Sequence, residues 1–300
     1  MYHKPVLLQE TIDLMDIKPD GVYVDVTFGG GGHSKAILEK LTTGRLIGFD
    51  QDKDALKNDL NDPRFQLINQ NFKYLTNFLR FYKAMPVDGI LADLGISSHQ
   101  IDDPTRGFST RFESELDLRM DQSAGLSAKH IINTFNTEDL KKVFKLYGEF
   151  PNAYHIAQRL VNSRMEKEIS STSELKEILK PFAEKGRENK FYARIFQALR
   201  IEVNNEIETL REFLSQTINL IRPGGRLVVI SYHSLEDRLV KNFMRSGNFE
   251  GKIEKDFYGN IISPYKPVTR KPIIPDESEL EGNPRSRSAK LRAAERTEHE

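Results

Sequence analysis

A run of glycines and three polar residues are the parts of this sequence whose types and spacing suit chemistry. The glycines occupy positions 29 to 32 and precede His33, while Asp50 and Asp93 each end an apolar run further along the chain. Glycine has no side chain, so a loop of glycines lets a ligand lie against main-chain N–H groups. A carboxylate at a suitable distance can accept hydrogen bonds from hydroxyl groups of the same ligand. These residues therefore predict a nucleotide-binding site.

Strands and helices alternate around these residues. Short apolar or β-branched runs at 21–27, 45–50, 65–69 and 87–95 have the composition of buried strands, and a helical pattern follows the glycines. This alternation is typical of a parallel sheet with helices on both faces, so the predicted fold class is α/β. In such a sheet a nucleotide approaches the main chain at the turn after the first strand. We therefore interpret the glycines as a binding loop rather than as a flexible linker.

The alternation stops between residues 104 and 195, where helical periodicity occurs without a convincing strand. It resumes with a long amphipathic helix, a Pro-Gly-Gly turn at 223–225 and a strand from Arg226 to Ser231. We predict a sheet domain formed by residues 1–103 and 196–300 and an inserted helical domain at 104–195. Beyond Ser246 the prolines predict extended loop, with a last strand or helix at 288–296.

Composition restricts both the partners and the chemistry. The chain contains 44 basic and 44 acidic residues, so nucleic-acid binding requires a local basic patch. It contains no cysteine, which excludes disulfides, thiolate metal sites and a cysteine nucleophile, and we expect no metal cofactor. No apolar run approaches the roughly 20 residues of a membrane span, and no signal-peptide core is present, so a cytoplasmic location without membrane contact is expected. A homodimer is compatible with the sequence.

The residues around the glycine loop restrict its ligand. No glycine of this loop is followed at the right distance by the Gly-Lys pair that a phosphate-binding Walker loop requires, since Lys35 follows Ser34. A dinucleotide fingerprint beginning at Gly29 requires glycine at position 34, where Ser34 stands, and this weakens the interpretation as a NAD site. Asp50 ends its strand at a distance from Gly29 that suits binding of a ribose. NAD and S-adenosylmethionine both contain that ribose, so Asp50 does not distinguish between the two cofactors.

Features of the later strands favour the second cofactor. Asp93 after the fourth strand, Phe72 after the third and the turn before the fifth together resemble class I methyltransferases dependent on S-adenosylmethionine. More narrowly, six segments resemble in order the motifs of the RsmH (MraW) family: TFGGGGHS, DLGISSHQID, LDLRMD, IFQALRIEVNNE, SYHSLEDRLVK and NPRSRSAKLRAAER. That family methylates the exocyclic N4 of a cytidine in the decoding region of small-subunit ribosomal RNA. The resemblance covers nearly the whole chain and implies the same activity, cofactor and rRNA partner.

The resemblance also implies site residues. The expected cofactor-binding residues are Gly31, Gly32, His33, Asp50, Phe72, Asp93 and Gln100. His33 could instead cap the helix that follows it.

Methyl transfer to an amine needs neither an enzyme nucleophile nor a metal, but an acceptor for the N4 proton would help. Asp93, Ser97, Ser98 or a main-chain carbonyl beside them could supply it. Tyr232 and His233, at the end of the fifth strand, are candidates for contact with the target base, although His233 could equally serve its own backbone. The predicted catalytic residues are therefore Asp93, Ser98 and His233.

A basic segment interleaved with aromatic residues lies at 180–200. Lys190, Arg194 and Arg200 are predicted to contact RNA phosphates, and Phe182, Phe191, Tyr192 and Phe196 to stack on unpaired bases. The alternative is an amphipathic helix with a charged, solvated face. A duplex would hide N4, so the target cytidine should be single-stranded or extruded. Two other functions stay open: a NAD-dependent oxidoreductase, and a non-catalytic RNA-binding assembly factor.

Overall fold

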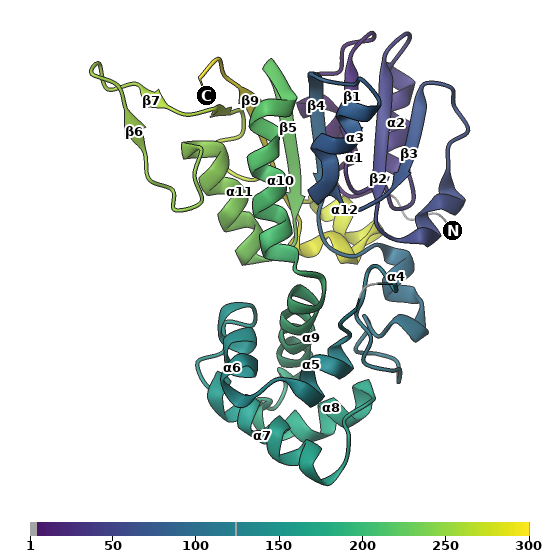
Figure 1. Cartoon of the computed structure of the whole chain (residues 1–300), viewed down its shortest axis with the longest axis vertical. Coiled ribbons are helices and arrows are strands. Elements are labelled where there is room, and N and C mark those ends of the chain that lie inside the picture. Colours follow the sequence, from purple (N-terminus) through teal and green to yellow (C-terminus); the bar gives the residue numbers. More distant parts are fainter. Residues whose placement is uncertain (1–4, 124, 300) are drawn as a thin grey trace. The chain divides into compact units, whose positions relative to one another are not determined.

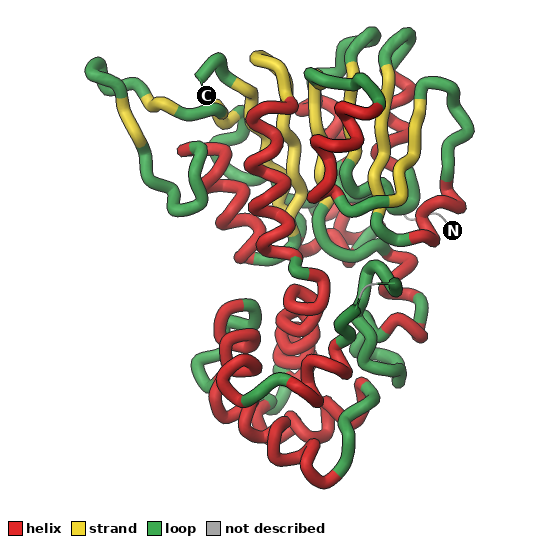
Figure 2. Tube along the Cα trace, viewed as in Figure 1, coloured by secondary structure: helices red, strands yellow, loops and turns green. Residues whose placement is uncertain are grey.

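The computed structural model describes residues 5–123 and 125–299, and the chain divides into two units. The first unit comprises Met1–Gly95 and Ile207–Glu300, and the second comprises Ile96–Glu206. The first contains the sheet, and the second is helical (Figure 2). The predicted boundaries at 104 and 195 both lie inside the second unit. The second unit extends beyond residue 195 because helix α9 (Glu188–Asn204) is continuous and its buried residues, including Leu199, belong to the core of this unit.

The first unit is built on a seven-stranded sheet with the order β3-β2-β1-β4-β5-β9-β8. Five strands are parallel: β1 (Val22–Asp25), β2 (Arg45–Asp50), β3 (Phe65–Asn69), β4 (Val87–Asp93) and β5 (Ile221–Ser231). The predicted α/β class and the four strands before residue 95 are confirmed. The fifth strand begins earlier than predicted, because it includes the Pro-Gly-Gly segment.

Two further strands complete this sheet after β5. β9 (Lys290–Arg296) runs antiparallel to both of its neighbours, β5 and β8 (Tyr265–Pro267). The last segment, predicted as strand or helix, is therefore a strand. β6 (Glu254–Lys255) and β7 (Ile261–Ile262) form a separate two-stranded hairpin. Helix α12 (Glu277–Gly282) lies between β8 and β9 in the sequence.

Helices cover both faces of the sheet (Figure 1). α3 (Leu75–Phe81), α10 (Glu206–Leu220) and α11 (Ser234–Ser246) pack on one face, and α1 (Leu8–Met15) and α2 (Gly32–Lys40) on the other. Strand residues alternate between the two cores, so that Val24 joins the first and Tyr23 the second. A fully buried side chain such as Phe213 contributes roughly 1.5–3 kcal/mol to folding. The two cores thus fix the sheet edge on which the candidate site lies.

The second unit consists of short helices around a core of its own. These are α4 (Ser98–Asp102), α5 (Ala128–Thr134), α6 (Thr137–Leu146), α7 (Ala153–Glu166), α8 (Thr172–Leu179) and α9. The helical periodicity predicted between residues 104 and 195 is confirmed, for example in α6 and α8. Side-chain caps from Ser127, Asn136 and Ser171 begin α5, α6 and α8. Sequence periodicity and capping chemistry therefore agree in this unit.

In the part of the chain that the structure describes, five 3₁₀ turns connect these elements: η1 (Lys53–Asn58), η2 (Phe72–Tyr74), η3 (Pro104–Arg106), η4 (Lys180–Phe182) and η5 (Pro284–Ser288). Among the described residues, no helix combines the length and apolar character that crossing a membrane requires.

Candidate active site

The predicted residues of the first unit gather at one edge of its sheet. Because β1 to β5 are parallel, the segments that follow their carboxyl ends lie along the same edge. Those segments carry the glycine loop and His33 after β1, Asp50 at the end of β2, Phe72 after β3, Asp93 at the end of β4 and Tyr232 and His233 after β5. In an α/β sheet this edge is where ligands bind.

The glycine loop is shaped by two close approaches. Gly31 has a φ of +74°, and a Cβ there would lie 2.8 Å from the ring of Phe28. A Cβ on Gly32 would overlap Pro5 Cγ, so Pro5 packs directly on the start of α2. At Gly30, by contrast, a Cβ would meet no atom of the described residues within 4 Å, so this part of the loop faces open space. Phe28 and Pro5 therefore pack against one side of the loop, and the loop at Gly30 is open to a ligand.

Asp25 is a site residue that the sequence analysis missed. It is buried in β1, and its Oδ2 accepts a hydrogen bond from Ser34 Oγ at 2.7 Å while its Oδ1 accepts one from the Thr27 N–H at 3.1 Å. Burial raises the pKa of Asp25, and the nearby His33 and the Ser34 hydroxyl oppose that rise. Ser34 thus ties the first turn of α2 to β1. An acid at the end of the short apolar strand β1 was the signal in the sequence.

Asp50 supports the same loop from β2. Its Oδ2 accepts the Gly29 N–H and its Oδ1 accepts the Asp52 N–H, both at 2.8 Å. Burial raises the pKa of Asp50 to about 6, and these two N–H groups oppose the rise. A carboxylate has about four acceptor positions, so two remain for hydroxyl groups of a ligand. The half-buried Asp50 can therefore fix the loop and bind a ribose at once.

Asp93 is connected to residues from three other segments. Its Oδ1 accepts a hydrogen bond from the Tyr232 hydroxyl at 2.8 Å, and its Oδ2 lies 3.8 Å from His33 Nδ1. Its main-chain N–H donates to Thr27 Oγ1 at 2.6 Å. Burial raises the pKa of Asp93 to about 6, while His33 and the Tyr232 hydroxyl oppose the rise. Asp93 therefore remains mostly ionised at pH 7, with its side chain 23% exposed.

The hydrogen bonds around Asp93 fix where its neighbours carry protons. His33 Nε2 lies 3.0 Å from the carbonyl oxygen of Val6, which can only accept, so Nε2 carries a proton and Nδ1 faces Asp93. Burial and the charge of Asp93 raise the pKa of Tyr232, so its hydroxyl stays protonated and donates. The Leu7 N–H donates to Glu279 Oε1 of α12 at 2.8 Å, which holds the segment carrying Val6. These contacts fix the orientation of His33 and Tyr232 around the Asp93 carboxylate.

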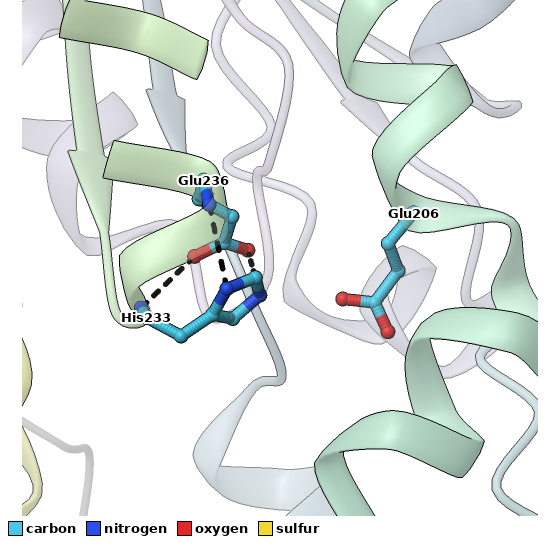
Figure 3. A group of neighbouring side chains, drawn as sticks. All are labelled: Glu206, His233 and Glu236. Carbon is cyan, nitrogen blue, oxygen red and sulfur yellow. Dashed lines mark hydrogen bonds and ion pairs between the residues drawn. The ribbon is translucent and has the colours of Figure 1, made fainter. Parts of the chain in front are cut away.

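His233 caps the helix that follows it. Its Nδ1 accepts the Glu236 N–H at 3.4 Å, and its Nε2 lies 3.2 Å from Glu236 Oε1, so the ring folds back on Glu236 (Figure 3). Glu236 Oε2 in turn accepts the N–H groups of Tyr232 and His233, at 2.9 and 3.3 Å. This capping box begins α11 and fixes the backbone of Tyr232. Contact of His233 with a target base stays a prediction.

Phe72 lies at the start of η2, just beyond β3. Its half-buried ring packs edge-on against Phe213 of α10, with centroids 5.2 Å apart. The packing holds the ring at the ligand-binding edge, and its contact with an adenine stays a prediction.

Two of the residues predicted for the cofactor and for catalysis, Gln100 and Ser98, belong to the second unit. Gln100 is buried in α4, where its Oε1 accepts the Ser97 N–H at 3.0 Å and its own N–H donates to Ser97 Oγ at 3.2 Å. Its side chain therefore forms part of a capping box. The side chain of Ser98 lies outside the described part of the structure. Cofactor binding by Gln100 and catalysis by Ser98 stay predictions.

The predicted RNA-binding residues of α9 differ in their surroundings. Lys190 is exposed, but Arg194 donates to the carbonyl oxygens of Gly148 and Glu149. Arg200 forms a bidentate pair with Glu206, with N–O distances of 2.8 and 2.9 Å. Both arginines therefore stabilise their own unit, and their contact with RNA stays a prediction.

The aromatic residues of this segment were interpreted wrongly in part. Tyr192 and Phe196 are buried in the core of the second unit, where they are unable to stack on bases. The amphipathic periodicity of α9 turns these two rings inward, which was the alternative that the sequence had left open.

Known proteins provide the deciding comparison. The model of the MraW methylase family matches residues 1–297. The chain belongs to the MraW methylase family. It is 57% identical over 294 residues to the ribosomal RNA small subunit methyltransferase H of Christiangramia forsetii, covering 98% of this chain and 97% of the relative. The corresponding protein of Parabacteroides distasonis is 56% identical over 297 residues, with 98% and 97% covered. The crystal structure of an rRNA methylase from Streptococcus thermophilus aligns with a TM-score of 0.44 and 12% identity, covering 99% and 100%.

Membership of the MraW family decides between the two cofactors. The chain is a methyltransferase dependent on S-adenosylmethionine, not an oxidoreductase, and its strand order forms a class I, Rossmann-like methyltransferase sheet. The residues fit this cofactor: the loop faces open space at Gly30, and Asp50 retains acceptor positions for a ribose. The resemblance of the six sequence motifs is thereby confirmed.

Proposed function

We propose that this MraW methylase transfers a methyl group to N4 of a cytidine in the decoding region of small-subunit rRNA. The enzyme is a small-subunit rRNA methyltransferase, in agreement with the names of relatives 52–57% identical to it. The observation that supports amino methylation is the Asp93 carboxylate, held by Tyr232 beside His33 at the ligand-binding edge. Such a group can accept the proton that an amino nitrogen must lose.

The chemistry requires two contributions from this chain. When bound, S-adenosylmethionine supplies the methyl group as a sulfonium, so no enzyme nucleophile is needed. The N4 lone pair of cytosine is delocalised into the ring, and an acceptor for the N4 proton makes that lone pair available. Asp93 accepts the proton as the N–C bond forms and the S–C bond breaks. The Tyr232 hydroxyl and the Thr27 contact orient the carboxylate, and desolvation at the sheet edge maintains its basicity.

Recognition of the substrate and its location are part of the same proposal. The second unit recognises the rRNA, with Lys190 as its exposed contact on α9. The target cytidine is single-stranded or extruded, because a duplex hides N4. The enzyme acts in the cytoplasm, independently of membranes and metal ions. Assembly as a homodimer stays a prediction.

Transfer of a labelled methyl group tests the proposal directly. Small subunits and naked rRNA lacking the modification are incubated with labelled S-adenosylmethionine, and the labelled nucleoside is identified and mapped. N4-methylcytidine in the decoding region is expected. Label in another nucleoside would reject the proposed target, and no incorporation into either substrate would favour the non-catalytic assembly factor. At saturating cofactor, Asp93→Asn should transfer methyl groups at least a hundredfold more slowly, in line with loss of an acid–base group.

A further inference from the structure

Exposed aromatic rings and free cations coincide on one segment of the first unit, residues 250–271, which we name the hairpin arm. Its strands β6 and β7 extend away from α11 and the sheet (Figure 1). Phe257 and Tyr258, at the turn of the hairpin, are 98% and 86% exposed. Single exposed apolar residues are common, but two adjacent rings with almost no protein contact indicate a binding surface.

The turn holds these rings in a defined position. The Asp256 carboxylate accepts the N–H groups of Tyr258 and Asn260, both at 2.8 Å, and the Asn260 side-chain amide at 2.9 Å. Gly259 has a φ of +87°, which lets the chain reverse. The two rings contact each other edge to face, with centroids 5.6 Å apart. A turn so constrained loses little conformational entropy when the rings bind a partner.

The base of the hairpin arm is tied to the body of the first unit. The Asn248 side chain donates to the carbonyl of Lys252 at 2.7 Å and accepts its N–H at 3.0 Å. Phe249, just before the arm, stacks on the buried Phe243 with centroids 5.3 Å apart. The buried hydroxyl of Tyr265 donates to Thr217 at 2.8 Å. The exposed rings thus lie at the end of an anchored stem.

Charge indicates the kind of partner. The arm carries five exposed cations, and within the described residues none of them forms an ion pair: Lys252, Lys255, Lys266, Arg270 and Lys271. Its acids are Glu250, Glu254 and Asp256, and the last is occupied in the turn. Five cations against three carboxylates give the arm a net charge of +2 on a chain whose total charge is zero, and three of the cations, Lys266, Arg270 and Lys271, lie on or just after β8 at the edge of the sheet. On α9, by contrast, Arg194 and Arg200 bind groups of their own unit.

We propose that the hairpin arm binds single-stranded RNA of the small ribosomal subunit. Phe257 and Tyr258 stack on unpaired bases, and the cations of the hairpin and of the adjoining edge strand β8 contact phosphates of the same strand. Exposed rings together with these cations match the two features common to all single-stranded RNA, its base faces and its phosphates. The inference rests on the proposed rRNA substrate and adds a contact in the first unit, remote in sequence from α9.

The absence of tryptophan from the sequence provides a direct test. Tyr258→Trp introduces a single tryptophan at the tip, and Phe81→Trp introduces one at another exposed aromatic position, 76% exposed on α3. An unstructured RNA of about 16 nucleotides should quench the first and leave the second unchanged, because stacking on a base quenches an indole. Quenching by assembled subunits but not by naked rRNA would overturn the proposal in favour of a protein partner. A change with protein concentration alone would overturn it in favour of a second copy.

Binding and turnover of the full-length protein test the energetic contribution. Phe257→Ala with Tyr258→Ala should weaken binding of the same RNA roughly tenfold or more. It should raise KM for small subunits, with kcat and cofactor affinity unchanged, while Phe81→Ala behaves as the parent protein. Replacing Lys252, Lys255 and Lys266 by alanine should reduce the salt dependence of log Kd by about 2, since each contact on a single strand contributes about 0.7. Unchanged RNA affinity in both variants would reject the arm as an RNA site.

The two proposals fail in distinguishable ways. Methylation by the parent protein together with normal behaviour of the arm variants would reject only the arm. Quenching of the Tyr258→Trp protein by RNA without any methyl transfer would reject only the catalytic proposal.

Discussion

Tyr232→Phe should shift the pH dependence of methyl transfer. The substitution removes the hydroxyl that donates to Asp93 Oδ1 at 2.8 Å and keeps the ring. A hydrogen bond to a charged group contributes about 1.5–3 kcal/mol, and 1.36 kcal/mol corresponds to one pKa unit. The pKa of Asp93, about 6 in the parent protein, should therefore rise to about 7–8. At pH 7 the ionised fraction falls from about nine-tenths to between a half and a tenth, so the rate should fall about two- to tenfold.

The assay is the rate of methyl transfer at saturating cofactor and substrate from pH 5.5 to 9. In the parent protein the rate should rise with pH through about 6, and in Tyr232→Phe through a value one to two units higher, with full recovery near pH 9. Tyr265→Phe is the matched control, because its buried hydroxyl also forms a 2.8 Å bond, with Thr217 away from Asp93. The control should lose about 1 kcal/mol of stability and keep the parent pH profile. A Tyr232→Phe profile that coincides with the parent would refute Asp93 as the proton acceptor.

Three further predictions concern charged groups. The pKa of Asp93 in the folded chain, about 6, exceeds its usual 3.8, so this group favours folding below pH 4 and the contribution disappears as the pH rises through 6. Asp93→Asn should therefore raise the free energy of unfolding at pH 8 by up to about 3 kcal/mol, as measured by denaturant titration; a destabilised variant would contradict this. The pKa of Asp50 is also about 6, so calorimetry should show weaker S-adenosylmethionine binding below pH 6, a dependence that Asp50→Asn should remove. Arg200→Ala should lower the free energy of unfolding by about 2 kcal/mol, because it leaves Glu206 unpaired. Lys190→Ala should weaken RNA binding and leave the free energy of unfolding unchanged. Equal effects of the two substitutions on RNA affinity would contradict the assignment of Lys190 to RNA and of Arg200 to the fold.

The sequence predicted those parts of the site that depend on the order of strands. Parallel strands buried on both faces are apolar along their length, so β1, β2 and β4 were visible as short apolar runs, and the edge strand β3 was visible through its apolar residues Phe65, Leu67 and Ile68. Once a parallel sheet was expected, Asp50 and Asp93 had to lie at one edge. The ends of the strands therefore contained enough information to place both acids.

Contacts between distant segments were beyond prediction from the sequence. The bond from Tyr232 to Asp93 joins residues 139 positions apart, and it depends on the register of β4 and β5. The contact of His33 with Val6 depends on a main-chain carbonyl, which leaves no mark in a sequence. Basic and aromatic residues at 180–200 suggested RNA binding, yet a helix that buries Tyr192 has the same composition. Composition shows which side chains a segment contains. Which of these side chains are exposed to solvent depends on the face of the helix on which each one lies.

The position of β9 has a consequence for synthesis of the protein. β9 occupies an interior place in the sheet although it is the last strand in the chain, and β8 reaches the sheet only through it. A nascent chain that has not yet released residues 290–296 therefore ends its sheet at β5, with an unpaired and largely apolar edge. Interrupted translation should leave a species that tends to aggregate rather than a partly active enzyme. Formation of the complete sheet therefore requires synthesis of residues 290–296.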